Sequence, residues 1–212
     1  MTWLLFQKTI EHLFVSLSAL ILALCIALPL GFYLSRVANK RLSMVIIRMA
    51  SLIQTIPGLA MIALIIVLLV SLRSVVHLPT TGYLPGILAL SLYAISPILT
   101  NTYTGITQAN RSLIDVGTGL GMSKRQILFL VEAPHAIPTI MAGIRIAGVW
   151  TLGMCTLTSL VGAGGLGDLI FQGLRSINGK YLLAGTLPSA FLAVAFEWGM
   201  TRLEHWLKVD FR

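Results

Sequence analysis

The stretch DVGTGLGMSKRQILFLVEAP, residues 115–134, is a polar, glycine-rich segment in a chain that consists mostly of Leu, Ile, Val and Ala. Of the 212 residues, 57% are hydrophobic and 10% are charged, and the mean hydropathy is +0.91. A soluble domain carries about 25% charged residues. The composition therefore indicates a membrane protein, in which residues 115–134 lie outside the hydrocarbon core.

Five apolar runs are long enough to cross a membrane, since a helix needs about 20 residues to span a hydrocarbon core of ~30 Å. They cover residues 13–34, 45–72, 84–104, 139–161 and 181–203. These runs predict an all-α, polytopic membrane protein with about five transmembrane helices. Because they occupy so much of the chain, we expect a single transmembrane domain over residues 1–212, with no separate soluble domain.

The basic residues predict the orientation through the positive-inside rule. With the N-terminus outside, the inner segments hold 11 of the 15 Lys and Arg residues, and the outer segments hold 4. We therefore expect a multi-pass protein of the cell membrane, plasma or inner, with its N-terminus outside, its C-terminus in the cytoplasm and a cytoplasmic loop at about residues 105–138. The cations lie in short gaps between apolar runs instead of forming a basic stripe, so no nucleic-acid partner is expected.

Three prolines lie within the apolar runs, at Pro29, Pro57 and Pro97. Proline removes a backbone donor and clashes with the preceding turn, so each one predicts a kink. A broken helix is tolerated in a bilayer only where protein or a watery cavity satisfies the freed carbonyl groups. The prolines therefore indicate either a transport pathway or ordinary helix packing, and the sequence leaves both open.

The loop of residues 105–138 has the pattern of a helix, a glycine turn and a second helix. Asp115 is placed near the start of the first helix, where a carboxylate suits the helix dipole. The glycines between residues 117 and 121 then permit a sharp reversal or the close approach of another backbone. Ser123 is a candidate N-cap of the second helix, which we expect to end before Pro134.

This loop resembles the EAA loop of the membrane subunits of binding-protein-dependent ABC importers, whose pattern is Glu-Ala-Ala, three residues, Gly, nine residues and Ile-x-Leu-Pro. Asp115-Val116-Gly117 takes the Glu-Ala-Ala place, Gly121 falls on the Gly, and Val131, Ala133 and Pro134 fall on Ile, Leu and Pro. The spacing matches throughout, whereas Asp115, Val116-Gly117 and Ala133 depart from the residue types of the pattern. By this resemblance the loop is a coupling helix that docks in a groove of a cytoplasmic ATPase. The residues it assigns to coupling are Asp115, Gly117, Gly121, Met122, Ser123, Val131 and Pro134.

Neighbouring segments narrow the resemblance to osmoprotectant permeases. QTIPGLAMIAL from residue 54, SLYAISPILTNTYTGI from residue 91 and IMAGIRIAG...LVGAGGLGDLIFQGL between residues 140 and 174 are similar to segments of the permeases that import glycine betaine, carnitine and choline. The resemblance implies a methionine-importer-like ABC permease fold. It also implies cytoplasmic ABC ATPase subunits, a second permease subunit that is identical or related, an extracytoplasmic substrate-binding protein and membrane lipid as partners. No cofactor is expected in this subunit, because ATP and Mg bind to the ATPase.

Two glycine motifs are misleading. GAGGLG, residues 162–167, matches the dinucleotide fingerprint, but neither a soluble βαβ unit nor an acidic residue about 20 positions further on accompanies it. GLGD, residues 165–168, matches a motif of intramembrane aspartyl proteases, but no second aspartate is predicted near it. We expect instead an outer re-entrant turn and a short helix after the fourth apolar run. The chain is therefore predicted to be a transport subunit and not an enzyme.

Small and weakly polar residues recur at helical spacing on three of the predicted spans. Such a face either packs helices closely or lines a pore, and both can hold along one helix. The candidate pathway residues are Gln54, Pro57, Gly58, Met61, Ser96, Thr100, Tyr103, Thr151, Cys155 and Thr158. A quaternary ammonium ion is normally held by a cage of aromatic faces, yet only 8% of the residues are aromatic and no predicted span clusters them. We therefore expect high-affinity selection in the separate binding protein and only weak binding in the permease.

Other functions compete with this interpretation. A secondary transporter or channel needs intramembrane charges for ion coupling or a charged selectivity ring, and the predicted spans are nearly bare of both. An intramembrane enzyme needs a catalytic constellation, which the scattered histidines do not form. Importers of methionine share the loop pattern, so another small solute is the alternative within the ABC class. For residues 123–134, the alternative to a coupling element is an amphipathic helix lying on anionic lipid.

Overall fold

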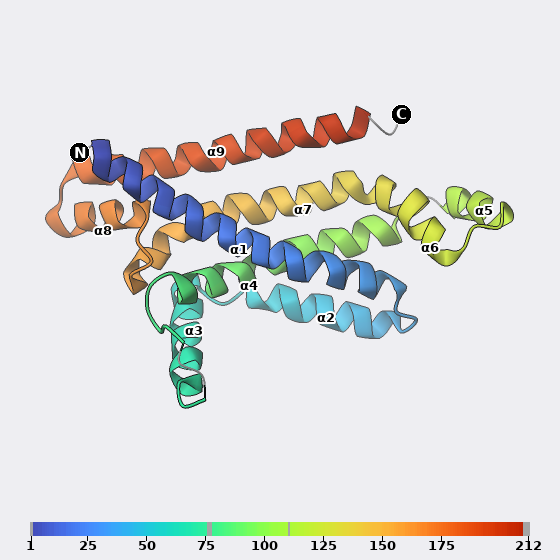
Figure 1. Ribbon diagram of the computed structural model, residues 1–212, viewed down its shortest axis with the longest axis horizontal. Helices are drawn as coiled ribbons and strands as arrows, with labels where there is room; N and C mark the ends of the chain where they lie inside the picture. The colour runs from blue at the N-terminus through green and yellow to red at the C-terminus, as the bar shows by residue number, and fades with distance from the viewer. Residues whose placement is uncertain (1, 76–77, 110, 210–212) are drawn as a thin grey trace.

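The computed structural model describes residues 2–75, 78–109 and 111–209, and the regular elements of these residues are all helical. Four long helices run along the molecule (Figure 1): α1 (Thr2–Arg36), α4 (Tyr83–Thr107), α7 (Ala133–Met154) and α9 (Gly179–Val209). Within the described part of the chain, these regions and one bent pair of helices provide up to five candidate membrane spans. The predicted all-α, polytopic architecture is confirmed.

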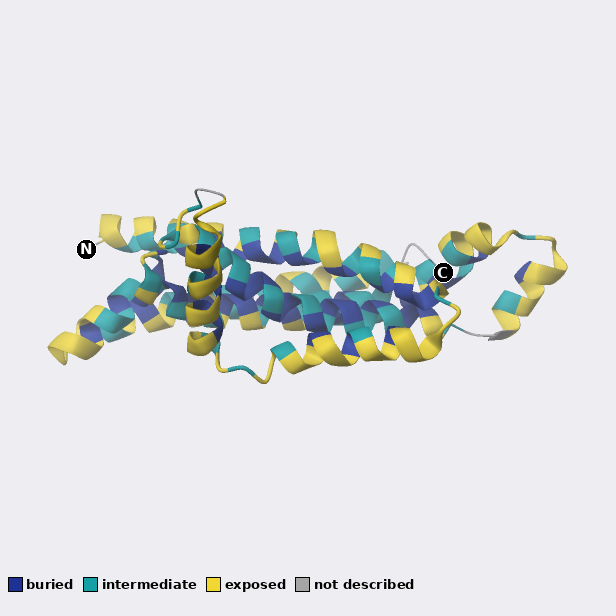
Figure 2. Ribbon diagram, turned by 90° about the horizontal axis from the view of Figure 1, so that it is seen from below, coloured by how far each residue is buried: buried dark blue, intermediate teal, exposed yellow. Residues whose placement is uncertain are grey.

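Helix α4 lies at the centre of the bundle. Helix α1 crosses one side of it, α7 packs along another side, and α9 packs against α7 (Figure 1). The helices approach closely at glycines: a Cβ on Gly31 of α1 would lie 2.7 Å from Thr102, and a Cβ on Gly143 of α7 would lie 2.7 Å from the carbonyl oxygen of Pro97. Because lipid tails are as apolar as Leu, close packing of this kind holds helices together in a bilayer. Figure 2 shows the buried residues along the facing sides of these helices.

The second apolar run forms two helices where we expected one kinked helix. Helices α2 (Lys40–Ile53) and α3 (Gly58–Leu72) meet at an angle of 104°. Pro57 has no N–H and disfavours the helical conformation at Ile56, so α2 ends before it. The Tyr93 hydroxyl donates a hydrogen bond to the Ile56 carbonyl oxygen, and Gln54 Nε2 donates one to the Tyr93 carbonyl oxygen at 3.3 Å. Helix α4 thus satisfies polar groups at the break.

The other prolines do not interrupt their helices. Helix α1 continues through Pro29, and α4 continues through Pro97. The second helix of the loop does not end before Pro134, which corrects that prediction: α6 (Lys124–Gln126) passes through a π-helical turn, η1 (Ile127–Glu132), directly into α7. Pro134 lies in the first turn of α7. The wide turn before it accommodates the proline, because π-helical bonding departs from the i−4 pattern with which a proline ring clashes.

The two ends of the bundle carry the short helices. At the loop end lies α5 (Arg111–Gly119), and at the N-terminal end α7 passes into a 3-10 segment, η2 (Cys155–Val161). Gly162 has a φ of +83°, and the chain then turns into α8 (Leu166–Ser176), which packs on α9. The turn and short helix expected after the fourth apolar run are confirmed. Helix α3 projects from the side of the bundle and is largely exposed (Figures 1 and 2).

We expect Gly143→Ala to lower the free energy of unfolding by about 1–3 kcal/mol, the usual cost of overpacking. The added Cβ would lie 2.6 Å from Asn101 Cβ and 2.7 Å from the Pro97 carbonyl oxygen. Gly153→Ala is the matched control on the same helix, since no described atom beyond its own neighbours and helix backbone lies within 4 Å of the added Cβ. It should be neutral or stabilise by up to ~1 kcal/mol. Thermal unfolding of the detergent-solubilised protein measures the stability of both variants. Equal changes in stability for Gly143→Ala and Gly153→Ala would contradict the close α4–α7 contact.

Candidate functional site

Helix α5 ends in a Schellman motif, a pattern of hydrogen bonds that closes many helices at a glycine. The Gly121 N–H donates to the Thr118 carbonyl oxygen at 3.0 Å, and the Met122 N–H donates to the Gly117 carbonyl oxygen at 3.0 Å. Gly121 has a φ of +80°, a left-handed conformation that glycine adopts at little cost. The predicted reversal of the loop is confirmed, and it is centred on Gly121.

The glycines of the loop have different surroundings. Gly117 is buried, and a Cβ there would lie 3.1 Å from Met122 Sδ. In contrast, no atom of the described chain lies within 4 Å of a Cβ placed on Gly121. Within this chain, Gly121 is therefore required by its backbone conformation and not by the close approach of another backbone. Asp115 lies exposed in the middle of α5, where we expected it near the start of the helix.

The second half of the loop begins with a capping box, which confirms the predicted N-cap at Ser123. Ser123 Oγ accepts a hydrogen bond from the Gln126 N–H at 3.3 Å, and Gln126 Oε1 accepts one from the Ser123 N–H at 2.8 Å. Val131 is half-buried in η1, and Pro134 follows in α7. The residues that the resemblance assigned to coupling thus lie in one folded unit that leads without a break into α7.

An ion pair that sequence analysis missed ties this loop to α1. Arg36, the last residue of α1, pairs with Glu132 of η1, whose side chain is 6% exposed. The rings of Phe32 and Phe129, from the same two elements, stack with their centroids 6.4 Å apart. A buried carboxylate is costly unless it is paired, so the pair holds η1 against the end of α1. No local pattern signals a contact between residues so far apart in the chain.

Charges at the N-terminal end fix α1 against the glycine turn before α8. Lys8 Nζ lies 2.8 Å from Glu11 Oε2 and 2.7 Å from Asp168 Oδ2. The Gly165 N–H donates to Glu11 Oε2 at 2.9 Å. A Cβ on Gly164 would overlap the same carboxylate, and its φ is +70°. The GAGGLG segment is thus a turn that binds a carboxylate of its own chain.

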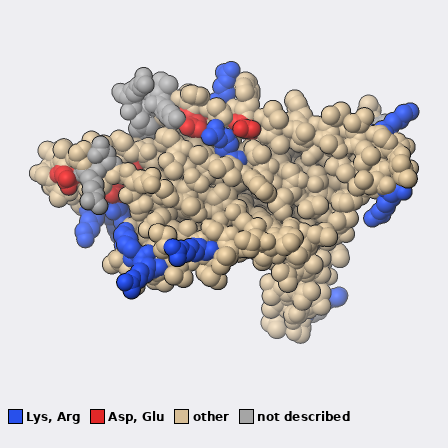
Figure 3. All heavy atoms as spheres, turned by 180° about the vertical axis from the view of Figure 1, so that it is seen from behind, with Lys and Arg blue, Asp and Glu red and all other residues tan. Residues whose placement is uncertain are grey.

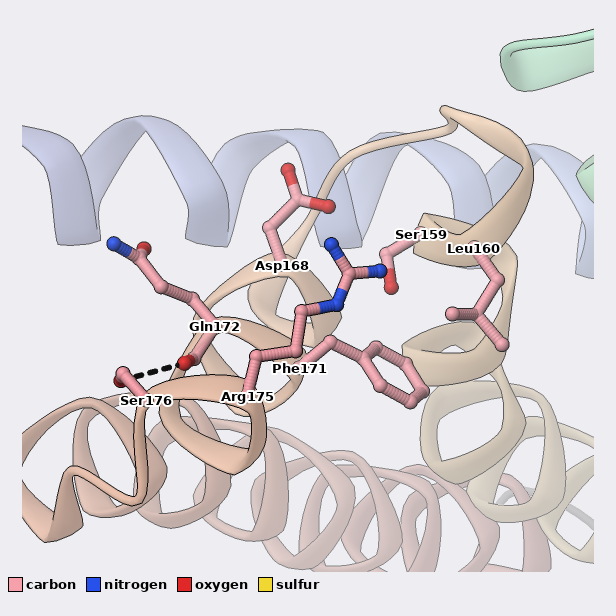
Figure 4. Close-up of a pocket in the computed structure, with 7 residues that line it drawn as sticks. All are labelled: Ser159, Leu160, Asp168, Phe171, Gln172, Arg175 and Ser176. Atoms are coloured by element: carbon pink, nitrogen blue, oxygen red, sulfur yellow. Dashed lines mark hydrogen bonds between the residues drawn. The ribbon is translucent and has the colours of Figure 1, made fainter.

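A surface cavity of about 450 Å³ opens beside this turn, between η2 and α8 (Figure 4). Its walls carry charges of both signs, from Asp168 and Arg175, together with the ring of Phe171. The remaining lining residues are Ser159, Leu160, Gln172 and Ser176. Such an open, mixed surface suits a small polar solute and a docking protein equally, so it favours neither. Among the described residues, no group of three or more His, Cys, Asp or Glu side chains is placed to hold a metal ion.

The candidate pathway residues of the fourth apolar run lie buried between helices. Thr151 and Thr158 are almost fully buried. Cys155 Sγ lies 3.5 Å from the His12 carbonyl oxygen of α1, and Thr158 lies 3.0 Å from a Cβ placed on Gly86 of α4. In this single chain they pack helices, which is one of the two alternatives for such a face. Their place on a pathway stays a prediction.

The candidate residues of the second and third runs lie at the α2–α3 break or along α4. Gln54 and Pro57 are exposed at the break. The other candidates are buried or half-buried: Gly58, Met61, Ser96, Thr100 and Tyr103. Ser96 Oγ lies 3.4 Å from Ser51 Oγ, so α2 and α4 also meet through hydroxyl groups. The structure therefore brings the candidates of the second and third runs together around the break. The candidates of the fourth run lie elsewhere, where Cys155 contacts α1 and Thr158 contacts α4.

A small cavity that sequence analysis did not anticipate adjoins the break. It has a volume of about 180 Å³ and is lined by Gln54, Tyr93, Pro97, Ile146 and Trp150. Only Gln54 is among the predicted pathway residues. Tyr93 and Trp150 were missed because they belong to different helices, α4 and α7, and neither helix carries an aromatic cluster by itself.

Known proteins resemble this chain over nearly its whole length. Residues 27–209 match the family of the binding-protein-dependent transport system inner membrane component. The carnitine transport permease protein OpuCB of Listeria monocytogenes is 40% identical over 201 residues, which cover 95% of this chain and 87% of that protein. The choline transport system permease protein OpuBB of Bacillus subtilis is 42% identical over 194 residues, which cover 92% of this chain and 84% of that protein.

Solved structures share the fold. The inward-facing MetNI methionine ABC transporter matches with a TM-score of 0.84 and 22% identity, covering 98% of this chain and 97% of that chain. An amino acid ABC transporter with histidines matches with a TM-score of 0.74 and 18% identity, covering 96% and 94%. These matches confirm the predicted methionine-importer-like fold. With the family match over most of the chain, they show that it belongs to the binding-protein-dependent transport system inner membrane components, the permease subunits of ABC importers.

Proposed function

We propose that this permease moves quaternary-ammonium osmoprotectants, such as glycine betaine, carnitine and choline, into the cell. The observation that carries the proposal is the 40–42% identity, over more than nine-tenths of the chain, to permeases named for carnitine and choline transport. The methionine transporter supports the fold alone, because its identity is 22%. Methionine or another small solute is therefore the weaker alternative.

The proposed assembly contains partners that supply energy and selectivity. ATP and Mg bind to a separate cytoplasmic ATPase, and this subunit binds no nucleotide. An extracytoplasmic binding protein delivers the solute, and a second permease subunit, identical or related, completes the pathway. Large apolar side chains stand exposed on α3 and α9, among them Leu64, Val67, Leu187 and Phe191. Lipid or the second permease subunit would cover them, since apolar patches of this extent are rarely left in water.

The proposed orientation places the loop end in the cytoplasm and the N-terminal end outside. It rests on the 11 to 4 division of Lys and Arg between the two sides. Figure 3 shows basic side chains at both ends of the molecule and on the projecting helix, and a mixed group of basic and acidic side chains part-way along, while most of the remaining surface is uncharged. A largely uncharged surface is what a hydrocarbon core requires of the part that it surrounds.

The proposed role of the loop is to couple the permease to the ATPase. Helix α5 is exposed and contacts η1. Through η1 it is connected to two spans, because η1 continues into α7 and the Arg36–Glu132 pair joins η1 to α1. A displacement of α5 would therefore reach the membrane as a movement of packed helices rather than bend a flexible loop.

We expect the assembled transporter to import quaternary-ammonium solutes. The permease should be reconstituted in proteoliposomes with its copurifying ATPase and with binding protein, and uptake of radiolabelled choline, glycine betaine, carnitine and methionine measured. ATP-dependent uptake of at least one quaternary ammonium solute, without uptake of methionine, is the expected result. Uptake of methionine alone would overturn the substrate proposal.

Labelling of single cysteines tests the orientation. In a background with Cys25 and Cys155 replaced by Ser, a cysteine at Ser176 should react with a membrane-impermeant thiol reagent in intact cells, and one at Ser123 should not. Both positions are exposed, so access differs only through the side of the membrane. Both cysteines should react after the membrane is permeabilised. The reverse pattern in intact cells would refute the orientation and, with it, the coupling role.

Substitution of Gly121 tests coupling. Gly121→Ala and Gly121→Arg both force a β-carbon into a φ of +80°, at a cost of about 1–2 kcal/mol. Beyond its chain neighbours, no described atom lies within 4 Å of a Cβ at this position. A difference between the two variants therefore comes from the rest of the Arg side chain, and a docked partner is the expected cause. We expect both variants to reach the membrane, and Gly121→Arg alone to lose most uptake and the stimulation of the ATPase by loaded binding protein.

Lys124→Gln provides the comparison for the lipid alternative. If residues 123–134 act mainly on anionic lipid, removal of this positive charge should impair uptake more than Gly121→Arg. If the loop couples to the ATPase, the order is reversed. Normal transport by Gly121→Arg in an assembled complex would show that the loop is not the coupling element.

A further inference from the structure

The cavity at the α2–α3 break lies at membrane depth. Helix α2 starts at the loop end and has 14 residues, so the break is about 21 Å along its axis, within a core of ~30 Å. Backbone outside a helix is tolerated there only where it meets protein or a water-filled cavity. Discontinuous helices also mark the substrate sites of many other transporters. The break is thus a place where a polar solute can meet the protein inside the membrane.

The cavity opens on the side of α4 that α1 does not cover. Leu99 and Thr102 are the residues of α4 that contact Gly31 of α1. Since each residue of a helix turns by about 100°, Tyr93 and Pro97 lie on roughly the opposite side. The cavity therefore lies away from α1, between the α2–α3 break, α4 and α7. Gln54 and Trp150 are exposed there, so a second permease subunit can close it.

The lining favours an organic cation without N–H groups. Tyr93 is 8% exposed, and its hydroxyl donates to the Ile56 carbonyl oxygen, so the ring is held in place and its face stays apolar. Trp150 is 64% exposed and presents the aromatic ring that attracts cations most strongly. Among the described lining residues, the polar side-chain groups are the Gln54 amide, the Tyr93 hydroxyl and the Trp150 indole N–H, and none of these residues carries a carboxylate. A volume of about 180 Å³ is below the ~300–1,000 Å³ of pockets for drug-sized molecules, so it suits a small headgroup.

A second groove adjoins this cavity on the side of the loop end. It is lined by Arg145, Ile146, Val149, Trp150 and Glu197, and it shares Ile146 and Trp150 with the first cavity. Helix α7 starts at the loop end, so Arg145 and Val149 lie on the loop side of Trp150. Trp150 thus stands at the junction of two adjoining hollows along the bundle.

We propose that the cavity lined by Gln54, Tyr93 and Trp150 is a weak, transient binding site for the quaternary-ammonium headgroup of the transported solute, with the two rings facing the cation. This inference rests on the proposed function, of which it specifies the intramembrane contact. Weak binding suits the role, because a solute that has to leave on the other side cannot be held tightly.

The test measures binding of tetramethylammonium to the detergent-solubilised complex of permease and ATPase, without binding protein, by saturation-transfer NMR. Trp150→Leu should raise the Kd about three- to tenfold, the range of a partly exposed cation–π contact, and Trp150→Phe should raise it less. The uncharged isostere of choline, 3,3-dimethylbutan-1-ol, should bind more weakly and change little in either variant. Trp206→Leu is the matched control, since Trp206 on α9 is 64% exposed, as Trp150 is, and does not line the cavity.

Three results would overturn the inference. Wild-type complex that shows no saturable tetramethylammonium binding up to high millimolar concentration has no such site. Equal losses for tetramethylammonium and for the uncharged 3,3-dimethylbutan-1-ol in Trp150→Leu would mean an apolar cavity of the kind that a lipid chain fills. Equal effects of Trp150→Leu and Trp206→Leu would place the binding elsewhere. Uptake by the wild-type transporter is measured separately. Uptake of a quaternary ammonium solute without binding in this cavity would refute the binding site and leave the substrate proposal standing.

Discussion

The contact of α1 and α7 with α4 is possible only because small residues stand where the helices cross. Gly31 and Gly143 meet α4 from α1 and α7, and Gly86 and Gly105 of α4 face Thr158 and Ala136. In a bilayer, where burial of apolar side chains supplies little net driving force, the attraction between helices depends on such close backbone approach. Helix α4 in turn holds the α2–α3 break through Tyr93, so the geometry of the cavity depends on this packing.

Polar contacts complement the apolar packing and lie at the two ends of α1. Arg36 joins its last turn to η1, while Lys8 and Glu11 join its first turns to the turn before α8. Helix α1 therefore connects the element that leads from the loop into α7 with the element that shapes the opposite end of the bundle. Rigid helices fixed at both ends transmit displacement, whereas a helix held only by lipid contacts could slide.

The proposed division of labour between permease and binding protein follows from the surfaces available. Two aromatic rings and one amide form a small cavity here, far less than the cage that binds a quaternary ammonium tightly. A separate protein that binds its solute tightly can supply selectivity, while a permease with weak contacts lets the solute move on. Low affinity in the membrane is then a requirement of transport and not a defect of the site.

By itself the sequence determined the membrane class, the long apolar spans, a reversal among the glycines of residues 117–121 and the cap at Ser123, because each depends on residues within one or two turns of each other. The loop motif likewise revealed the family, since its spacing is local. Pro134 was misjudged because a π-helical turn before a proline leaves no residue signature. Only the tertiary structure decided the 104° bend at the break, the Arg36–Glu132 pair and the meeting of Tyr93 with Trp150 around one cavity. These contacts join residues far apart in the chain, and the packing of whole helices, which no local pattern encodes, brings them together.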